Sequence, residues 1–154
     1  MDRDKTTSSL YPCGRPLKTF PEPLRLVVLG ATGSIGTQTL DLVKRNPHRL
    51  EVAAVSCHGR VEELARHLAD LSEAVPGHPA PLVAVADPDA HARAAALPGL
   101  KEHLLPGGPG APGEAVSAPD DIHVVVNGLV GAVGLEPTLK AAERGVRIAL
   151  ANKE

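Results

Sequence analysis

The sequence predicts an α/β fold, a Rossmann-like, doubly wound parallel sheet in a single domain. Short apolar runs alternate with segments of helical periodicity from residue 24 onward. The apolar runs are apolar at nearly every position, which is typical of parallel strands covered by helices on both faces. A glycine-rich turn, Gly30 to Gly36, joins the first run to the first helical segment, as in dinucleotide-binding folds.

Length and composition agree with one packed domain. The chain has 154 residues, of which 43% are apolar and 22% are charged. Tyr11 and Phe20 are the only aromatic residues, so the core must consist of valine, leucine, isoleucine and alanine. A formal net charge of −2 does not favour nucleic acid or a membrane surface as a partner.

The N-terminal residues are predicted as a flexible extension, 1–23, ahead of the domain, 24–154, because prolines interrupt them repeatedly. They contain no apolar block of the kind that signal peptides carry, and no run in the chain approaches the length of a membrane span. Cys13 and Cys57 are too few for a disulfide framework and match no zinc or CxxC spacing. We therefore expect a cytoplasmic protein.

The first two strand and helix pairs follow from periodicity. Leu26 to Leu29 is a continuous apolar run and predicts a strand, and the helix after it ends before Asn46-Pro47. Leu50 to Ser56 is predicted as the second strand. The second helix has apolar residues at i, i+3, i+4, i+7 and i+10, namely Val61, Leu64, Ala65, Leu68 and Leu71.

The later elements depend more on turn residues. After a third strand, Leu82 to Ala86, Asp87-Pro88 is typical of a helix N-cap followed by proline, and this helix is expected to end near Leu97. Residues 98–120 are rich in glycine and proline and are predicted as loop. Two further strands, over 122–127 and 146–151, are joined by a helix over 137–144 that Gly145 closes.

The turn Gly30-Ala31-Thr32-Gly33-Ser34-Ile35-Gly36 is the candidate phosphate site. Gly30 permits the tight reversal, Gly33 lets a pyrophosphate approach the backbone, and Gly36 lets the helix pack closely on the strand. Free N–H groups and the helix dipole favour a phosphate there, and Thr32 and Ser34 can add hydroxyl donors. A glycine-rich turn without a ligand is the alternative.

The end of the second strand distinguishes NAD from NADP, because an acidic residue there binds the ribose 2′-hydroxyl of NAD. Glu51 has the right sequence distance but stands at the start of the strand, at the wrong end of the sheet. The strand instead leads through Ser56 and Cys57 to His58, Gly59 and Arg60, where a 2′-phosphate would find the Ser56 hydroxyl, an imidazole and a guanidinium. We therefore predict NADP contacts at these last three residues, with an ordinary solvated loop as the alternative.

Two other segments are expected at the same crevice. The glycine-rich residues 127–134 follow the fourth strand, which should lie beside the first, and can lie flat against a nicotinamide. Asn152, Lys153 and Glu154 follow the last strand and point to the ligand crevice, or else form a surface tail. The histidines are scattered without metal-ligand spacing, and no metal site is predicted.

Three stretches together, LVVLGATGSIGTQTLDLVKRNP, VNGLVGAVGLEPTLKAAERG and IALANKE, resemble the 1-deoxy-D-xylulose 5-phosphate reductoisomerase family over residues 24–154. Many dehydrogenases share a GATGxxG turn, but GxxGLxPT leading to ANKE is typical of this family. The resemblance covers its N-terminal NADPH-binding domain. It implies an oxidoreductase that rearranges 1-deoxy-D-xylulose 5-phosphate and reduces the product with NADPH to 2-C-methyl-D-erythritol 4-phosphate, for isoprenoid synthesis by the non-mevalonate pathway.

The resemblance also implies roles for single residues. NADPH contacts fall on Thr32, Gly33, Ser34, Ile35, Asn152 and Glu154, and the family's substrate-binding lysine falls on Lys153. The family usually has an Ala-Gly-x-Asn type of sequence where this chain has Cys57-His58-Gly59-Arg60. A homodimer is implied for the full-length enzyme.

The family's sequence continues beyond this match with a serine, an Asp-x-Glu motif for Mg²⁺ or Mn²⁺, a lid and a C-terminal helical domain. We therefore expect the chain to be a fragment or truncated product that binds NADPH without turnover, since the catalytic and C-terminal domains are absent. Two alternatives stay open. One is the N-terminal domain of another GATGxxG dehydrogenase, such as a semialdehyde dehydrogenase. The other is a free-standing NADP-binding or redox-sensing module.

Overall fold

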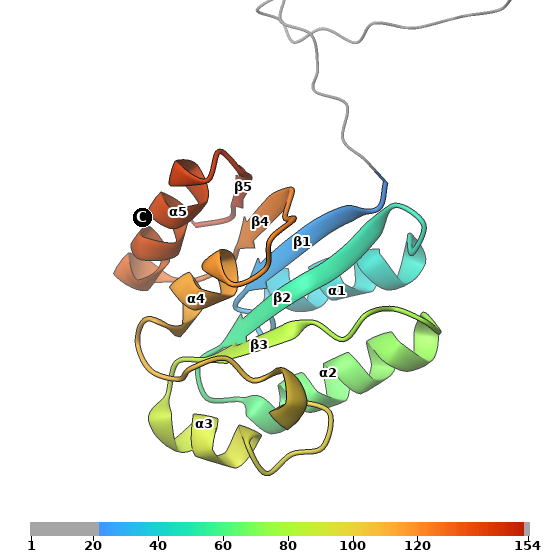
Figure 1. Cartoon of the computed structure of the whole chain (residues 1–154), viewed down its shortest axis with the longest axis horizontal. Coiled ribbons are helices and arrows are strands. Elements are labelled where there is room, and N and C mark those ends of the chain that lie inside the picture. The colour runs from blue at the N-terminus through green and yellow to red at the C-terminus, as the bar shows by residue number, and fades with distance from the viewer. Residues whose placement is uncertain (1–21, 153–154) are drawn as a thin grey trace, which may run out of the picture.

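The structure, a computed structural model, describes residues 22–152 and has a five-stranded parallel sheet with helices on both faces (Figure 1). The strand order is β3-β2-β1-β4-β5. The strands are β1 (Leu24–Leu29), β2 (Leu50–Cys57), β3 (Leu82–Val85), β4 (Val124–Asn127) and β5 (Arg147–Leu150). The chain moves outward from β1 to β3 and then returns to the other side of β1. The predicted fold class is confirmed, and the order reverses between β1 and β4, where such sheets bind ligands.

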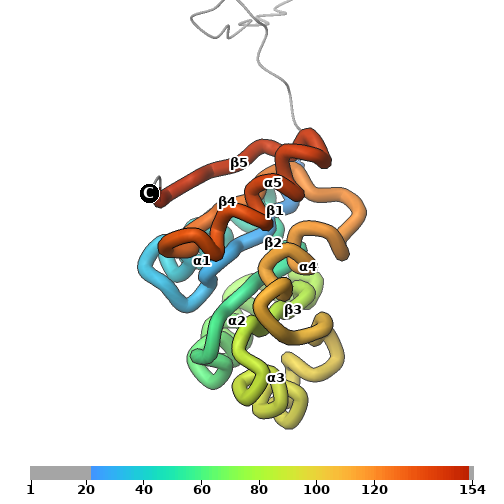
Figure 2. Tube along the Cα trace, turned by 90° about the vertical axis from the view of Figure 1, so that its left-hand side faces the viewer, coloured from blue at the N-terminus to red at the C-terminus, as the bar shows by residue number. Residues whose placement is uncertain are grey.

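The helices form two layers, one on each face of the sheet (Figure 2). One layer has α1 (Ser34–Arg45), α2 (Val61–Ala74) and α3 (Pro88–Ala94), and the other has α4 (Ala111–Ser117) and α5 (Leu135–Glu143). Alternate side chains of β1 serve both layers, because Leu26 and Val28 pack toward the first layer, and Val27 and Leu29 toward the second. The core is aliphatic, as the composition predicts.

Most predicted elements are confirmed, including the start of α3. The Asp87 carboxylate accepts a hydrogen bond of 2.7 Å from the Ala90 N–H, and Pro88 is the first helical residue. The helix ends at Ala94 rather than near Leu97, and turns follow it.

The prediction of a loop over 98–120 is wrong. Lys101–His103 forms a short 3₁₀ helix, Leu104 makes a parallel bridge to Val83 beside β3, and α4 lies within this segment. The side chains of Ala111, Ala115 and Val116 are buried in the second layer. Residues 98–120 therefore build part of the core and carry the chain from β3 across to β4.

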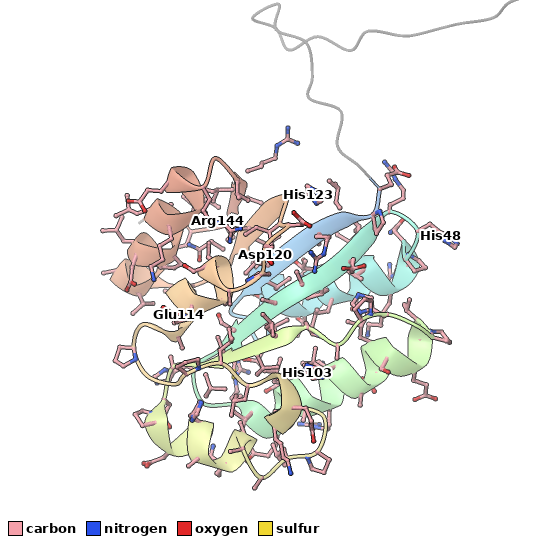
Figure 3. The ribbon with its side chains drawn as sticks, in the orientation of Figure 1. His48, His103, Glu114, Asp120, His123 and Arg144 are labelled. Carbon is pink, nitrogen blue, oxygen red and sulfur yellow. The ribbon has the colours of Figure 1, made fainter. Side chains whose placement is uncertain are left out.

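The glycine and proline content led to the wrong prediction of a loop, because both residue types occur within the buried helix α4. Pro112 lies in the first turn of α4, where its missing N–H costs nothing. A Cβ atom on Gly113 would lie 2.8 Å from Lys140 Nζ and 2.9 Å from Glu136 Oε1, both on α5. Arg144, near Asp120 in Figure 3, donates to the Asp120 carbonyl at 2.7 Å and to the Val116 carbonyl. Gly113 therefore lies at a close contact between α4 and α5.

The strand β5 also differs from the prediction of strands apolar on both covered faces. It is the outermost strand beside β4, and within the described residues it pairs only with β4 (Figure 2). Three of its four residues are exposed, including Leu150 at 47%. Leu150 belongs to a set of exposed apolar side chains on this side of the domain, with Val130, Val133, Leu135 and Leu139.

Candidate cofactor site

Three loops meet at the carboxyl ends of β1, β2 and β4, which confirms that the fold brings these predicted segments together. The N–H of Gly30 donates to the Ser56 hydroxyl at 3.2 Å, and the N–H of Ala31 donates to the Ser56 carbonyl at 2.8 Å. On the other side, the N–H of Gly128 donates to the Leu29 carbonyl at 3.1 Å. The turn after β1 is therefore held from both neighbouring strands.

Steric constraints explain why two positions of this turn are glycine. Gly30 has φ +76°, a left-handed conformation that favours glycine. At Gly36 an added Cβ atom would lie 2.3 Å from the Gly30 carbonyl oxygen, so only glycine lets α1 approach β1 this closely. Gly33 is less constrained, because the nearest atom to its added Cβ is the Gly30 oxygen at 3.3 Å.

The start of α1 suits an anion. The first hydrogen bond of the helix joins the Thr37 N–H to the Gly33 carbonyl at 2.9 Å, so the N–H groups of Ser34, Ile35 and Gly36 have no acceptor within the helix. The first turn of α1 carries no acidic residue. Ser34 and Ile35 are exposed, while Thr32 is 7% exposed. This helix start has free donors and the positive end of the helix dipole.

The loop after β2 is fixed by the segment after β3. The N–H of Ala86 donates to the Cys57 carbonyl at 3.0 Å, and the N–H of Asp87 donates to the His58 carbonyl at 3.1 Å. His58 and Arg60 are exposed, as a phosphate contact requires, although Arg60 also pairs with Glu63 at 3.2 Å. The expected help from the Ser56 hydroxyl is not found, because Ser56 is fully buried and accepts the Gly30 N–H.

Asn127 organises the loop over 127–134, a role that the sequence reasoning missed. The side chain is 1% exposed. Its Nδ2 donates to the Gly134 carbonyl at 3.0 Å and to Thr138 Oγ1 at 2.9 Å, and its Oδ1 accepts the Leu129 N–H at 3.1 Å. Gly131–Gly134 forms a short 3₁₀ helix. The segment is therefore a clamped turn rather than the plain flexible connection that composition left open.

A hollow of about 550 Å³ lies between this turn and β5. Its lining is mostly apolar and consists of Asn127, Leu129, Val130, Gly131, Ala132, Gly134, Leu135, Thr138, Leu150 and Asn152. Such a surface fits a flat ring with few polar groups. Asn152 is therefore at the predicted crevice, whereas Lys153 and Glu154 lie outside the described residues.

Glu51 and His78 make structural contacts away from this site. Glu51, at the start of β2, pairs with Arg25 at 2.9 Å, which confirms that it lies at the amino end of the strand. His78 lines a separate hollow of about 260 Å³ between α2 and the 98–103 segment. Its Nε2 accepts the Val52 N–H at 3.1 Å, and its Nδ1 lies 2.7 Å from the Pro79 carbonyl oxygen. Both ring nitrogens therefore serve to hold the chain beside β2.

Within residues 22–152, no three histidine, cysteine, aspartate or glutamate side chains gather closely enough to hold a metal ion. This part of the chain therefore does not fit a divalent metal. Among the same residues, no helix has the length and apolar character needed to cross a membrane.

Cys57 is a free thiol with low reactivity at neutral pH. Its side chain is 2% exposed, and burial raises its pKa from 9.0 to about 11. Because the thiolate is the reactive form, this thiol is a poor redox sensor. The observation counts against the redox-sensing alternative as far as Cys57 would carry it.

The same pKa predicts a loss of stability in alkali. Between pH 9 and about 11 the Cys57 thiol ionises in the unfolded chain but not in the folded one, so the free energy of unfolding falls as the pH rises. From pH 8 to 10.5 the loss due to this group is about 2 kcal/mol. Urea unfolding of the wild type and Cys57→Ala at both pH values measures it. Equal losses in the two proteins would contradict the buried, neutral thiol.

Known proteins of one family are similar to most of this chain. The family model described as 1-deoxy-D-xylulose 5-phosphate reductoisomerase matches residues 26–154. The enzyme of that name from Kitasatospora griseola is 45% identical over 134 residues, covering 84% of this chain and 33% of the relative. The one from Streptomyces coelicolor is 44% identical over 143 residues, covering 86% of this chain and 31% of the relative.

Solved structures show the same likeness. The reductoisomerase from Zymomonas mobilis in complex with NADPH has a TM-score of 0.68 and 35% identity, covering 85% of this chain and 32% of that chain. A second one, in complex with NADPH, fosmidomycin and magnesium, has a TM-score of 0.69 and 34% identity, covering 84% and 30% of the two chains. The chain spans about a third of the length of the curated relatives it matches. It belongs to the 1-deoxy-D-xylulose 5-phosphate reductoisomerase family.

Proposed function

We propose that this chain is the NADPH-binding part of a 1-deoxy-D-xylulose 5-phosphate reductoisomerase. One observation carries the proposal. The start of α1, with free N–H groups and no acidic residue in its first turn, opens between the 57–60 loop and the hollow beside β5. A dinucleotide needs these three subsites in this order: a 2′-phosphate site, a pyrophosphate site and a site for a flat ring.

The residues divide the work of binding. The backbone N–H groups of Ser34 and Ile35 would hold the pyrophosphate, with Gly30, Thr32 and Gly33 shaping the turn, since the Gly33 N–H donates to the Gly30 carbonyl at 2.9 Å. His58, Gly59 and Arg60 would hold the 2′-phosphate. The hollow near Asn152 would hold the nicotinamide ring and exclude water from one face of it. When bound, NADPH would supply the hydride, and the residues of this domain would bind and orient the cofactor.

The metal, the substrate contact, the homodimer and the location are further parts of this proposal. Rearrangement of 1-deoxy-D-xylulose 5-phosphate calls for a divalent metal, whose ligands would come from outside residues 22–152. Lys153 is proposed to contact the substrate, and Glu154 the cofactor. The homodimer and the cytoplasmic location are proposed from the family resemblance and from the cysteine content.

The proposal predicts a preference for NADPH that depends on the 57–60 loop. Arg60→Ala is expected to weaken NADPH binding about tenfold and to leave NADH binding unchanged, because it removes a charged donor to the 2′-phosphate alone. Fluorescence titration with each nucleotide measures both dissociation constants. Arg45→Ala is the matched control, since Arg45 is an exposed arginine at the last turn of α1. NADH binding as tight as NADPH binding in the wild type would refute the assignment of the loop.

A further inference from the structure

A side chain from outside the predicted site reaches the 57–60 loop. Arg93, on α3, donates from Nη2 to the Gly59 carbonyl oxygen at 3.0 Å and from Nε to Glu62 Oε1 at 3.0 Å. Gly59 lies 34 residues earlier in the chain. Nothing in the sequence pattern pointed to this contact, because it depends on α3 lying beside the start of α2.

The Gly59 carbonyl is the third of three successive backbone carbonyls in this loop that accept a hydrogen bond. The carbonyl of Cys57 accepts the Ala86 N–H, and the carbonyl of His58 accepts the Asp87 N–H. The next residue, Pro88, has no N–H to offer. Arg93 supplies the donor for the third carbonyl, that of Gly59. Three successive peptide units of the loop are thus held by the segment from the end of β3 into α3.

Arg93 also offsets the negative charge of Glu62 beside the loop. Glu62 lies in the first turn of α2, two residues after Arg60, and its carboxylate would repel a phosphate bound at the loop. Its own backbone N–H and the Arg93 guanidinium hold the pKa of this carboxyl below its usual range, so it is ionised at neutral pH. The ion pair with Arg93 offsets this negative charge at 3.0 Å.

We infer that Arg93 is a positioning residue that makes the site selective for a dinucleotide with a 2′-phosphate. The inference rests on the proposed NADPH site. Arg93 holds the Gly59 peptide in the conformation that faces the phosphate and offsets the charge of Glu62. Both effects act on the 2′-phosphate, and neither acts on the parts that NADPH and NADH share.

The fold itself depends little on this pair. The Arg93 side chain is 51% exposed and that of Glu62 is 58% exposed, and exposed pairs contribute little to stability. Variants at position 93 are therefore expected to fold, which makes nucleotide selectivity measurable. A merely structural role would change the binding of both nucleotides together.

The test compares Arg93→Ala, Arg93→Lys and the wild type by titration with NADPH, NADH and 2′,5′-ADP. Arg93→Ala is expected to weaken NADPH and 2′,5′-ADP about fivefold and to leave NADH unchanged. Arg93→Lys keeps a charge and a donor and is expected to lose less. The matched control is Arg49→Ala, since Arg49 also pairs with a glutamate, Glu22 at 3.3 Å, but at the amino end of β2.

Each result is decisive. An unchanged ratio of NADPH to NADH affinity in Arg93→Ala would overturn the inference, and so would an equal loss for both nucleotides. A lysine variant no better than alanine would also contradict it. If the wild type binds NADPH no better than NADH, the assignment of the 2′-phosphate site fails, and this outcome is seen before any variant is measured.

Discussion

Gly36→Ala is expected to lower the free energy of unfolding by about 3 kcal/mol or to prevent folding. The new Cβ atom would lie 2.3 Å from the Gly30 carbonyl oxygen and 2.5 Å from the Ala31 Cα. These are backbone atoms of the turn that three hydrogen bonds hold to β2 and within itself, so they cannot rotate away. Alanine normally stabilises a helix by about 1 kcal/mol over glycine, which makes a loss here diagnostic of the clash.

Urea unfolding followed by circular dichroism measures the change. Gly59→Ala is the matched control, because an added Cβ there meets no atom within 4 Å and Gly59 has no left-handed φ. It is expected to change stability by less than about 0.5 kcal/mol. A Gly36→Ala protein as stable as the wild type would show that α1 does not approach β1 as closely as described.

Asn127→Ala is expected to cost about 3 kcal/mol of stability and to weaken NADPH binding as well. The substitution removes a buried side chain that makes three hydrogen bonds across the 127–134 turn. It leaves the Leu129 N–H without its acceptor in a part-buried position. The turn beside the hollow proposed for the nicotinamide would then lose its fixed shape, so binding and stability should fall together.

Urea unfolding gives the stability, and hydrogen exchange at the Leu129 amide reports on the turn itself. Asn46→Ala is the control, because Asn46 Nδ2 also donates to a carbonyl, that of Leu42 at 2.9 Å, but in an exposed position. It is expected to cost less than about 1 kcal/mol. Unchanged exchange at Leu129 in the Asn127 variant would contradict the clamp.

The glycine-rich turn after β1 shows how far sequence patterns carry the prediction. The positions of Gly30, Gly33 and Gly36 between a strand and a helix were enough to predict both the turn and the packing role of Gly36. The five strands followed from continuous apolar runs, although β1 begins at Leu24 rather than Leu26 and β4 at Val124 rather than Ile122. The position of Glu51 at the amino end of β2 was also predictable, because it depends only on strand direction.

Glycine in α4 shows where the same reasoning fails. Gly113 and Pro112 are typical of a loop, yet they belong to a buried helix that contacts α5 through Lys140 and Glu136. The local sequence could not distinguish a glycine that bends the chain from one that admits a neighbouring side chain. Ser56 is a similar case, since its hydroxyl is taken by the Gly30 N–H rather than left for a ligand.

The sequence by itself determined the parallel sheet, the alternation of its five strands with α1, α2, α3 and α5, and the location of the glycine-rich turn after β1. These depend on periodicity and on backbone conformation within a few residues, which local patterns record. Only the tertiary structure decided that Asn127 clamps its own loop, that α4 completes the second helix layer, and that Arg93 reaches Gly59. Such contacts join elements that are distant in the sequence, and the local sequence of one element does not specify its partner. They therefore become visible only when the sheet has brought those elements together.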